Sequence, residues 1–236
     1  MKYFSRRSYI PLLIVLAFFW FFYLSTWFGS NILLSSRPSS IHAAIDRVAP
    51  NVVMILSKDN VLGAGIIIDP QEGIVLTSKH LFVPGGSYTL RTQYGQTYSL
   101  EDIFPDNLHD LAVGRIAPDA ALQKLSPITL LISQNSLQRG DDVVSFGALW
   151  LNQSIILSGG IISDTRQRVT LNDVSGSDYF IQTDVNAESG FSGGPLINIR
   201  GELIGVNTAV LGVNTSISWS TPITQELLQD FISRTK

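Results

Sequence analysis

The sequence contains no cysteine, and this absence removes several chemistries at once. Disulfide scaffolds, cysteine-based zinc sites and cysteine nucleophiles are excluded, whereas an oxidising compartment is compatible with the composition. Histidine is also scarce, with only His42, His80 and His109 available as imidazole bases. Because the sequence has no metal-ligand constellation, phosphate loop or dinucleotide fingerprint, we expect no metal and no cofactor.

Charge is sparse as well. Only 15% of the 236 residues are charged, and the formal net charge is −3 at pH 7. This balance gives no indication of a basic face, so nucleic acid is not an expected partner. Hydrophobic residues make up 45% of the chain, which is enough for one domain with a substantial core and an appendage.

One long stretch without charge follows the N-terminus. Ile10–Phe28 is mostly apolar and rich in aromatic residues, and it comes after Lys2, Arg6 and Arg7. At about 1.5 Å per residue, a helix of this length would cross a hydrocarbon core of about 30 Å. Basic residues before the span favour a cytoplasmic N-terminus, with the rest of the chain outside.

A cleaved signal peptide is the main alternative for this stretch. The apolar run is long for a signal peptide, and no small-residue cleavage site follows it. A buried core helix is the least favoured reading, because nothing in the run suits a water-facing side. We therefore expect a cytoplasmic segment at 1–9, a transmembrane anchor at 10–28, a serine-rich linker at 29–39 and an extracytoplasmic domain at 40–236.

The pattern after the linker favours strands. A short helix is expected over Ile41–Val48, where apolar residues recur on one face and Pro50 follows. From there on, short β-branched runs alternate with glycine, asparagine, aspartate and proline, with a hairpin turn at Arg200–Gly201. A closing helix is expected over Gln225–Arg234. Many short strands without intervening helices predict an all-β barrel or sandwich.

The stretch "SGFSGGPLIN" at 189–198 raises the question of a nucleophile at Ser192. An α/β-hydrolase elbow is excluded because its histidine must follow the serine, and none does. A subtilisin-like order could use Asp46 or Asp69 with His80, but that fold needs helices between its strands. The trypsin-like order of histidine, aspartate and serine is satisfied by His80, Asp110 and Ser192.

Five segments, one of which contains this stretch, carry a family resemblance: "GAGIIIDPQEGIVLTSKHLF" (63–82), "HDLAVGRI" (109–116), "LSGGIISDT" (157–165), "QTDVNAESGFSGGPLIN" (182–198) and "GELIGVNTAV" (201–210). Together they resemble the HtrA/Deg-type serine proteases, and "SIHAAIDRVAPNVVMI" (40–55) resembles the entry segment of those enzymes. The resemblance covers about residues 40–225. It implies an all-β, trypsin-like double β-barrel with a short N-terminal helix and a C-terminal helix, here behind an N-terminal transmembrane helix.

The resemblance also implies catalytic roles. His80 would be general base and then acid, Asp110 would orient it, and Ser192 would attack the peptide carbonyl. The N–H groups around Gly190 and Ser192 would form the oxyanion hole, with that of Phe191 assisting. His109 is expected to be solvated and not catalytic, and His42, in the entry helix, to be inert.

Substrate preference is inferred from two places in the family pattern. Asn186 stands where basic-specific trypsin relatives carry an acid, so cleavage after lysine or arginine is not expected. The strand that lines the primary pocket in the family is apolar here. We expect Asn186, Ile204, Gly205, Val206 and Asn207 to shape a pocket for small or medium apolar residues.

Three departures from the family pattern stand out. No PDZ domain is expected after the closing helix. Phe191 replaces the small polar residue that usually precedes the serine, so it either packs between the barrels or leaves the oxyanion hole unformed. Residues 164–180 form a polar segment where the family keeps a regulatory loop.

These observations predict a membrane-anchored serine endopeptidase of the periplasm. It would cleave unfolded or exposed segments of envelope proteins, in protein quality control or a stress response. A catalytically weak, polypeptide-binding module is the alternative, suggested by Phe191 alone, and an anchored structural β-domain is a third. The resemblance further implies a homotrimer formed through the entry segment.

Overall fold

The computed structural model describes residues 41–58, 60–131, 133–149, 153–169, 179–210 and 216–233. The expected cytoplasmic segment, anchor and linker lie outside the described residues, as does most of the expected regulatory loop. Among the helices that are described, none has the length and apolar character needed to cross a bilayer.

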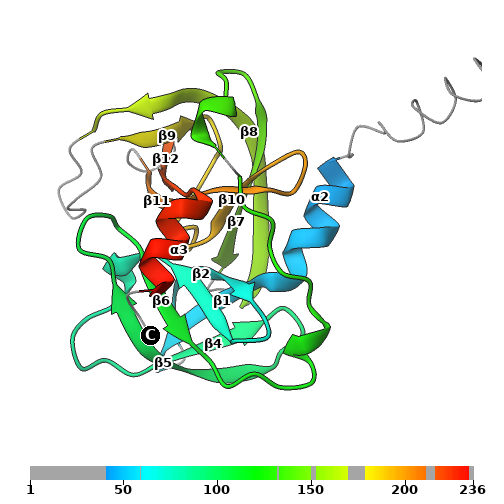
Figure 1. Cartoon of the computed structure of the whole chain (residues 1–236), viewed down its shortest axis with the longest axis vertical. Coiled ribbons are helices and arrows are strands. Elements are labelled where there is room, and N and C mark those ends of the chain that lie inside the picture. Colours follow the sequence, from blue (N-terminus) through cyan, green and yellow to red (C-terminus); the bar gives the residue numbers. More distant parts are fainter. Residues whose placement is uncertain are drawn as a thin grey trace, which may run out of the picture. The chain divides into compact units, whose positions relative to one another are not determined.

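The domain begins with the predicted helix. α2 (Ile41–Val48) buries Ala44 and Val48, so the sequence-based boundaries of this helix are confirmed. It runs into a 3-10 turn, η1 (Ala49–Asn51), and then into the first strand. Figure 1 shows α2 packed on the outside of the strands.

Two closed barrels of six antiparallel strands form the body of the domain (Figure 1). The first contains β1 (Val52–Ser57), β2 (Asn60–Asp69), β3 (Ile74–Thr77), β4 (Tyr88–Thr92), β5 (Thr97–Pro105) and β6 (Ala112–Arg115), in the order β1-β2-β3-β6-β5-β4. The second contains β7 (Asp142–Leu149), β8 (Ser154–Gln167), β9 (Phe180–Thr183), β10 (Pro195–Asn198), β11 (Leu203–Val210) and β12 (Ser218–Pro222), in the order β10-β11-β12-β9-β8-β7.

Shorter elements complete the chain. The 3-10 turns η2 (Lys79–Leu81), η3 (Leu122–Lys124) and η4 (Gln134–Ser136) lie in the connections, and α3 (Gln225–Ser233) closes the described part of the chain. The predicted hairpin at Arg200–Gly201 joins β10 to β11. The predicted all-β double barrel with two flanking helices is therefore the observed fold.

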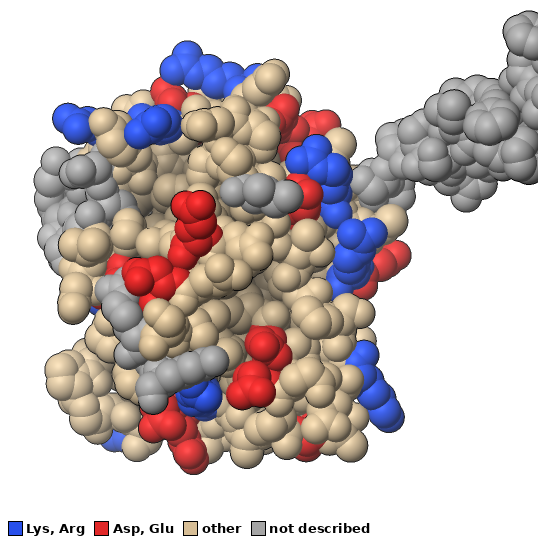
Figure 2. Space-filling model, in the orientation of Figure 1, with Lys and Arg blue, Asp and Glu red and all other residues tan. Residues whose placement is uncertain are grey.

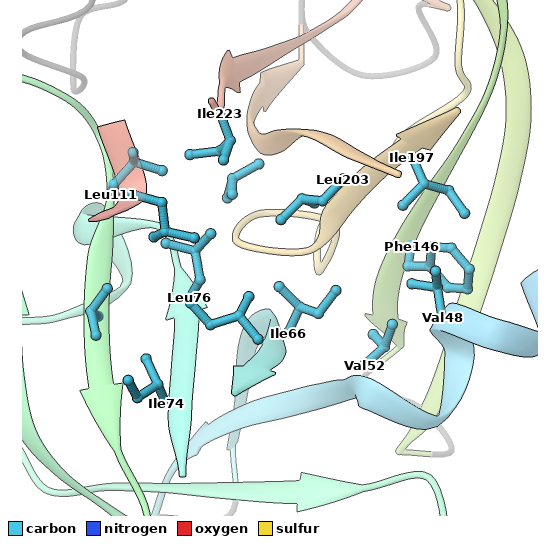
Figure 3. Packing of buried hydrophobic residues seen from close by; sticks show 14 of the residues in the cluster. Val48, Val52, Ile66, Ile74, Leu76, Leu111, Phe146, Ile197, Leu203 and Ile223 are labelled. Atoms are coloured by element: carbon cyan, nitrogen blue, oxygen red, sulfur yellow. The ribbon is translucent and has the colours of Figure 1, made fainter. Parts of the chain in front are cut away.

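The largest apolar cluster lies between the barrels and under both helices (Figure 3). Ile66 and Leu76 contribute from the first barrel, Phe146 and Ile197 from the second, and Val48 from α2. These side chains are fully buried. Because one continuous core joins the two barrels, loops from both can be held together at their junction.

Charged side chains are distributed unevenly on the face shown in Figure 2. Lysine and arginine lie mostly around its edge, whereas aspartate and glutamate lie both around the edge and near the centre. The view is dominated by uncharged residues, as the low fraction of charged residues in the sequence predicts.

Candidate active site

Strand register brings two of the predicted catalytic residues together. His80 lies on η2, directly after β3, and Asp110 lies just before β6. β3 and β6 pair antiparallel with Thr77 opposite Ala112, so the end of one strand meets the start of the other. The segments that carry His80 and Asp110 are therefore fixed side by side by the first barrel.

His80 and Asp110 make two hydrogen bonds. The His80 Nδ1 lies 2.7 Å from one Asp110 carboxylate oxygen, and the backbone N–H of His80 donates to the other at 3.0 Å. Asp110 is 1% exposed, whereas the His80 side chain is 28% exposed. Because an ionised carboxylate only accepts, the Nδ1 carries the shared proton and the lone pair of Nε2 is left for a substrate-side partner.

Ser192 lies in a loop made of two consecutive turns. The N–H of Phe191 donates to the Glu188 carbonyl at 3.1 Å, and the N–H of Gly194 donates to the Phe191 carbonyl at 2.9 Å. The third residue of each turn is a glycine with positive φ, Gly190 at 103° and Gly193 at 81°. The serine before each glycine has negative φ, so both turns are type II, which favours glycine at the third position.

This turn type sets the direction of the N–H groups beside Ser192. Type I and type II turns differ by a flip of the central peptide, the one that joins the second and third residues of the turn. In the first turn, this peptide carries the N–H of Gly190. A type I turn would point its carbonyl to the side on which the type II turn points that N–H. The N–H groups of Gly190 and Ser192 donate to no described residue, whereas that of Phe191 is used within the turn. Gly190 and Ser192 therefore offer two donors, and the expected contribution of the Phe191 N–H is not supported.

The serine loop packs against the part of the first barrel that carries His80. The carbonyl of Ser192 accepts a hydrogen bond from the N–H of Ala64 on β2 at 2.8 Å. A β-carbon on Gly193 would lie 2.2 Å from the Thr77 hydroxyl and 3.0 Å from a methyl group of Leu81. Ser192 is thus held across the barrel junction, next to the segment that contains His80.

Asn207 on β11 fixes this arrangement further. Its carbonyl accepts from the N–H of Gly193 at 2.8 Å and from the hydroxyl of Ser78 at 3.0 Å. Its side chain donates to the Phe146 carbonyl and accepts from the Ser220 hydroxyl. Expected as a pocket residue, Asn207 is 7% exposed and links the serine loop to the segment before His80.

The other expected pocket residues are placed differently from one another. Asn186 is exposed at the surface of the second barrel. Ile204 and Val206 are fully buried, so their side chains pack in the core and do not face solvent. Gly205 faces the backbone of Thr221, where a β-carbon would lie 3.0 Å from the carbonyl oxygen. The apolar specificity stays a prediction.

Phe191 packs inside the second barrel. Its side chain is 3% exposed and joins the apolar cluster that includes Val185, Leu196 and Ile204. Of the two expectations for this residue, burial is therefore the observed one, although the burial lies within the barrel. The free N–H of Gly190 shows that the bulky side chain does not collapse the loop.

A second histidine–carboxylate pair was not foreseen from the sequence. His109 Nδ1 lies 2.6 Å from an Asp106 carboxylate oxygen, which also accepts from the N–H groups of Leu108 and His109. Burial alone would raise the pKa of Asp106, but these bonds and the His109 charge outweigh it, so the pKa lies below its usual value. The spacing of Asp106 and His109 in one turn was the available signal.

Lys79 connects the two pairs. Its ammonium nitrogen donates to the carbonyl of Asp106 at 3.0 Å, and the next residue is His80. The N–H of Asp106 donates to the carbonyl of Leu111 at 2.8 Å. Asp106 therefore ties the turn that presents Asp110 to the turn that presents His80.

Metal ligation finds no support in the part of the chain that the structure describes. No group of three or more histidine, aspartate or glutamate side chains is arranged there to hold an ion. In each of the two histidine–aspartate pairs, the imidazole Nδ1 contacts one carboxylate oxygen. The site instead holds a hydrogen-bonded histidine–carboxylate pair next to a serine loop with two unbonded backbone N–H groups, the kinds of group that a Ser-His-Asp mechanism uses.

Comparison with known proteins agrees with this geometry. Residues 63–206 match the family described as the trypsin-like peptidase domain. The chain is 32% identical to the serine protease HTRA4 of Mus musculus over 85% of its length, and 34% identical to the serine endoprotease DegS of Haemophilus influenzae over 74%. A solved variant of the HtrA-type protease AlgW with a tripeptide superposes with a TM-score of 0.69 at 26% identity, over 82% of this chain.

The relatives are longer than this chain. The matched part covers 43% of the mouse protein, 53% of the Haemophilus protein and 62% of the AlgW chain. The region that matches the family, residues 63–206, includes His80, Asp110 and the loop of Ser192. The chain belongs to the HtrA/Deg family of trypsin-like serine proteases.

Proposed function

We propose that this protein is a serine endopeptidase in which His80, Asp110 and Ser192 act as a triad. The observation that carries the proposal is the pair formed by His80 and Asp110, in which the imidazole Nδ1 lies 2.7 Å from a carboxylate oxygen. Beside this pair lies a serine loop with free N–H groups at Gly190 and Ser192. Membership of a family of trypsin-like serine proteases supports the same reaction.

In the first half of the reaction, the hydroxyl oxygen of Ser192 attacks the peptide carbonyl carbon. The hydroxyl proton passes to Nε2 of His80, and the carbonyl oxygen becomes an oxyanion that accepts from the N–H groups of Gly190 and Ser192. Asp110 stabilises the imidazolium through Nδ1. The C–N bond then breaks, His80 gives its proton to the leaving amine, and an acyl-enzyme on Ser192 remains.

The second half repeats these roles with water. His80 takes a proton from the water molecule that attacks the acyl carbon, and the same two N–H groups receive the new oxyanion. When the C–O bond to Ser192 breaks, the proton returns from His80 to the serine oxygen. The products are a free carboxylate and the regenerated enzyme.

The proposed location is extracytoplasmic. Ile10–Phe28 would anchor the protein in the inner membrane, with the basic N-terminus inside and the protease domain in the periplasm. Substrates would be unfolded or exposed segments of envelope proteins, cleaved after small or medium apolar residues, in protein quality control or a stress response. A homotrimer through the entry segment is part of this proposal.

Labelling with a fluorophosphonate probe tests the proposed nucleophile. The full-length chain, reconstituted in lipid nanodiscs, is treated with the probe and assayed in parallel for casein hydrolysis. Labelling and hydrolysis are both expected, and both are expected to disappear in Ser192→Ala. Folded protein that neither labels nor cleaves would overturn the endopeptidase and favour the weakly active polypeptide-binding module.

Asp110→Asn is the matched test of the pair. It preserves the shape of the side chain but favours the wrong imidazole tautomer, so kcat should fall by about 10⁴-fold while the protein stays folded. Specificity is tested with a peptide library, in which preferential cleavage after lysine or arginine would refute the predicted apolar preference.

A further inference from the structure

The serine loop, residues 188–194, lies along one edge of β7. On the opposite edge, β8 pairs with β7 over its whole length. On the edge of the loop, β10 pairs with β7 only as far as Leu196 opposite Ser145. Beyond that point the loop takes the place of β10, and the N–H of Ala148 donates to the carbonyl of Gly190 at 2.9 Å. The loop is therefore built on a strand that the second barrel holds in position.

Gly147, at the centre of this contact, leaves space for Phe191. A β-carbon on Gly147 would lie 2.7 Å from the Cγ of Phe191 and 2.9 Å from its Cα. Gly147 has no positive φ and lies opposite Ile156 in an unbroken ladder, so its own backbone conformation does not require glycine. Glycine inside a strand often marks the close approach of another part of the chain. The contact with Phe191 is therefore what requires glycine at this position.

The phenyl ring of Phe191 is held on its other sides by the core of the second barrel. The side chain is 3% exposed and shares an apolar cluster with Val185, Leu196 and Ile204, which come from three different segments. Because protein cores are close-packed, a ring enclosed in this way leaves the attached backbone little freedom to move. The Cα of Phe191 is therefore fixed between β7 and the cluster.

Phe191 is also shared by the two turns of the serine loop. As the last residue of the first turn, it donates its N–H to the carbonyl of Glu188 at 3.1 Å. As the first residue of the second turn, its carbonyl accepts from the N–H of Gly194 at 2.9 Å. The N–H groups that donate to no described residue belong to its two chain neighbours, Gly190 and Ser192. A fixed Phe191 therefore fixes both turns and the direction of both of these N–H groups.

We propose that Phe191 is a positioning residue for the oxyanion hole and that Gly147 is the complementary surface against which it is held. The N–H groups of Gly190 and Ser192 keep their direction because the buried ring fixes the turns on either side. This order comes from the core of the barrel, so no bound ligand is needed to create it, and preorganised donors cost no reorganisation during the reaction. The inference rests on the proposed function in taking these two N–H groups as oxyanion donors.

Gly147→Ala tests this pair without removing any atom from the core. The added methyl group pushes against the ring and the Cα of Phe191, so the loop must shift along β7. An oxyanion donor acts mainly in the transition state, so its displacement should lower kcat by about 100-fold and change KM little. Steady-state kinetics of the full-length chain in lipid nanodiscs, with a fluorogenic peptide that has valine before the scissile bond, gives both constants.

Phe191→Ala removes the anchor itself and should also lower kcat by about 100-fold. Phe191→Leu keeps a buried apolar group and should retain a rate within about tenfold of the parent. Circular dichroism and urea unfolding identify the conditions in which each variant is folded. If Phe191→Ala does not fold, Gly147→Ala decides, since it leaves the core intact.

Phe180→Ala is the matched control. Phe180 on β9 is 1% exposed and also lies in the second barrel, but it does not belong to the apolar cluster that holds Phe191. Its replacement should lower stability without lowering the kcat of the folded protein. The comparison separates positioning of the donors from a general loss of packing.

Amide hydrogen exchange measures the order of the loop without any catalysis. The N–H groups of Phe191 and Gly194 are bonded within the turns, so their exchange reports opening of the loop. Mass spectrometry of the peptide that covers residues 188–195 should show exchange about tenfold faster in Gly147→Ala and Phe191→Ala than in the parent. Phe180→Ala and Phe191→Leu should exchange at close to the parent rate.

Parent-like kcat and exchange in folded Gly147→Ala and Phe191→Ala would overturn the proposal. So would a loop that loosens while kcat stays at the parent value, because Phe191 would then order the loop without positioning the donors. An equal loss of kcat in Phe180→Ala would also overturn it, by assigning the effect to general packing. A parent protein without hydrolytic activity would fail in the labelling experiment, and the exchange measurement would still decide whether Phe191 and Gly147 fix the loop.

Discussion

The ammonium nitrogen of Lys79 lies 3.0 Å from the backbone carbonyl of Asp106. This bond joins the residue before His80 to the turn that ends at Asp110, so it spans the two segments whose side chains form the candidate catalytic pair. Hydrogen bonds from charged donors typically contribute about 1.5–3 kcal/mol to stability. Part of that energy should keep the imidazole of His80 aligned with Asp110.

Lys79→Met should therefore lower kcat by about threefold to tenfold and leave KM little changed, because the donor is lost but the apolar stem remains. Lys79→Arg retains a cationic donor and should restore most of the rate. Steady-state kinetics with a short peptide that carries no bulky apolar residue outside its cleavage site gives both values. Equal rates in Lys79→Met and the parent enzyme would show that the bond does not position His80.

Gly190→Ala should damage the oxyanion hole. The φ of Gly190 is 103°, and a β-carbon there would lie 2.0 Å from the Ala148 carbonyl, so the turn must rearrange and its N–H must move. Loss of one oxyanion donor costs about 10²–10³-fold in kcat. Gly95→Ala is the control, since Gly95 also has a positive φ, 85°, but open space around it. A small effect of Gly190→Ala on kcat would argue against its N–H as a donor.

Phe191→Asn should destabilise the second barrel. Removing a buried phenyl ring costs about 3–5 kcal/mol, and the amide adds polar atoms to the apolar cluster around Val185 and Ile204. Urea unfolding of the parent and variant measures the loss, and Phe191→Leu, which keeps an apolar group, should lose less. From the sequence alone, Phe191 could instead leave the oxyanion hole unformed, in which case asparagine at this position would raise hydrolysis. Higher hydrolysis by a fully stable Phe191→Asn protein would restore that idea.

Asp106 should make stability depend on acid. Its pKa is lowered in the folded protein, so the ionised form is favoured by folding, and the stabilisation is complete above the unfolded value of 3.8. As pH falls below about 4 and through the lowered pKa, this contribution is lost. The free energy of unfolding of the parent should therefore drop more steeply in this range than that of Asp106→Asn. Parallel slopes in urea titrations at several pH values would contradict the assignment.

The sequence predicted helices and hairpins well in segments where one short-range pattern of residues dominates. The apolar face of Ile41–Val48 gave the correct helix, and the turn residues at Arg200–Gly201 gave the correct hairpin. In both, the signal and the structure lie within a few neighbouring residues. The order of His80, Asp110 and Ser192 added the choice of fold, because it excluded the arrangements in which histidine follows serine.

The pocket residues were harder to predict, because burial is decided by contacts between distant segments. Ile204 and Val206 were expected among the residues that shape the pocket, and the structure buries both side chains in packed clusters of the barrels. Asn207 was expected beside them, and its polar groups instead bind backbone and side chains of three other segments. Alternation along a strand tells which residues share a face, but it does not tell which face a neighbouring barrel covers.

The sequence by itself determined the all-β class, the two helices of the domain and the identity of the candidate base, acid and nucleophile. Only the tertiary structure decided that Phe191 is a core residue and that Lys79 and Asp106 connect the segments that carry His80 and Asp110. The reason is physical. Residue types and their short-range periodicity limit which secondary structure a segment can form. The residues that the segment contacts depend on how the closed barrels bring distant parts of the chain together.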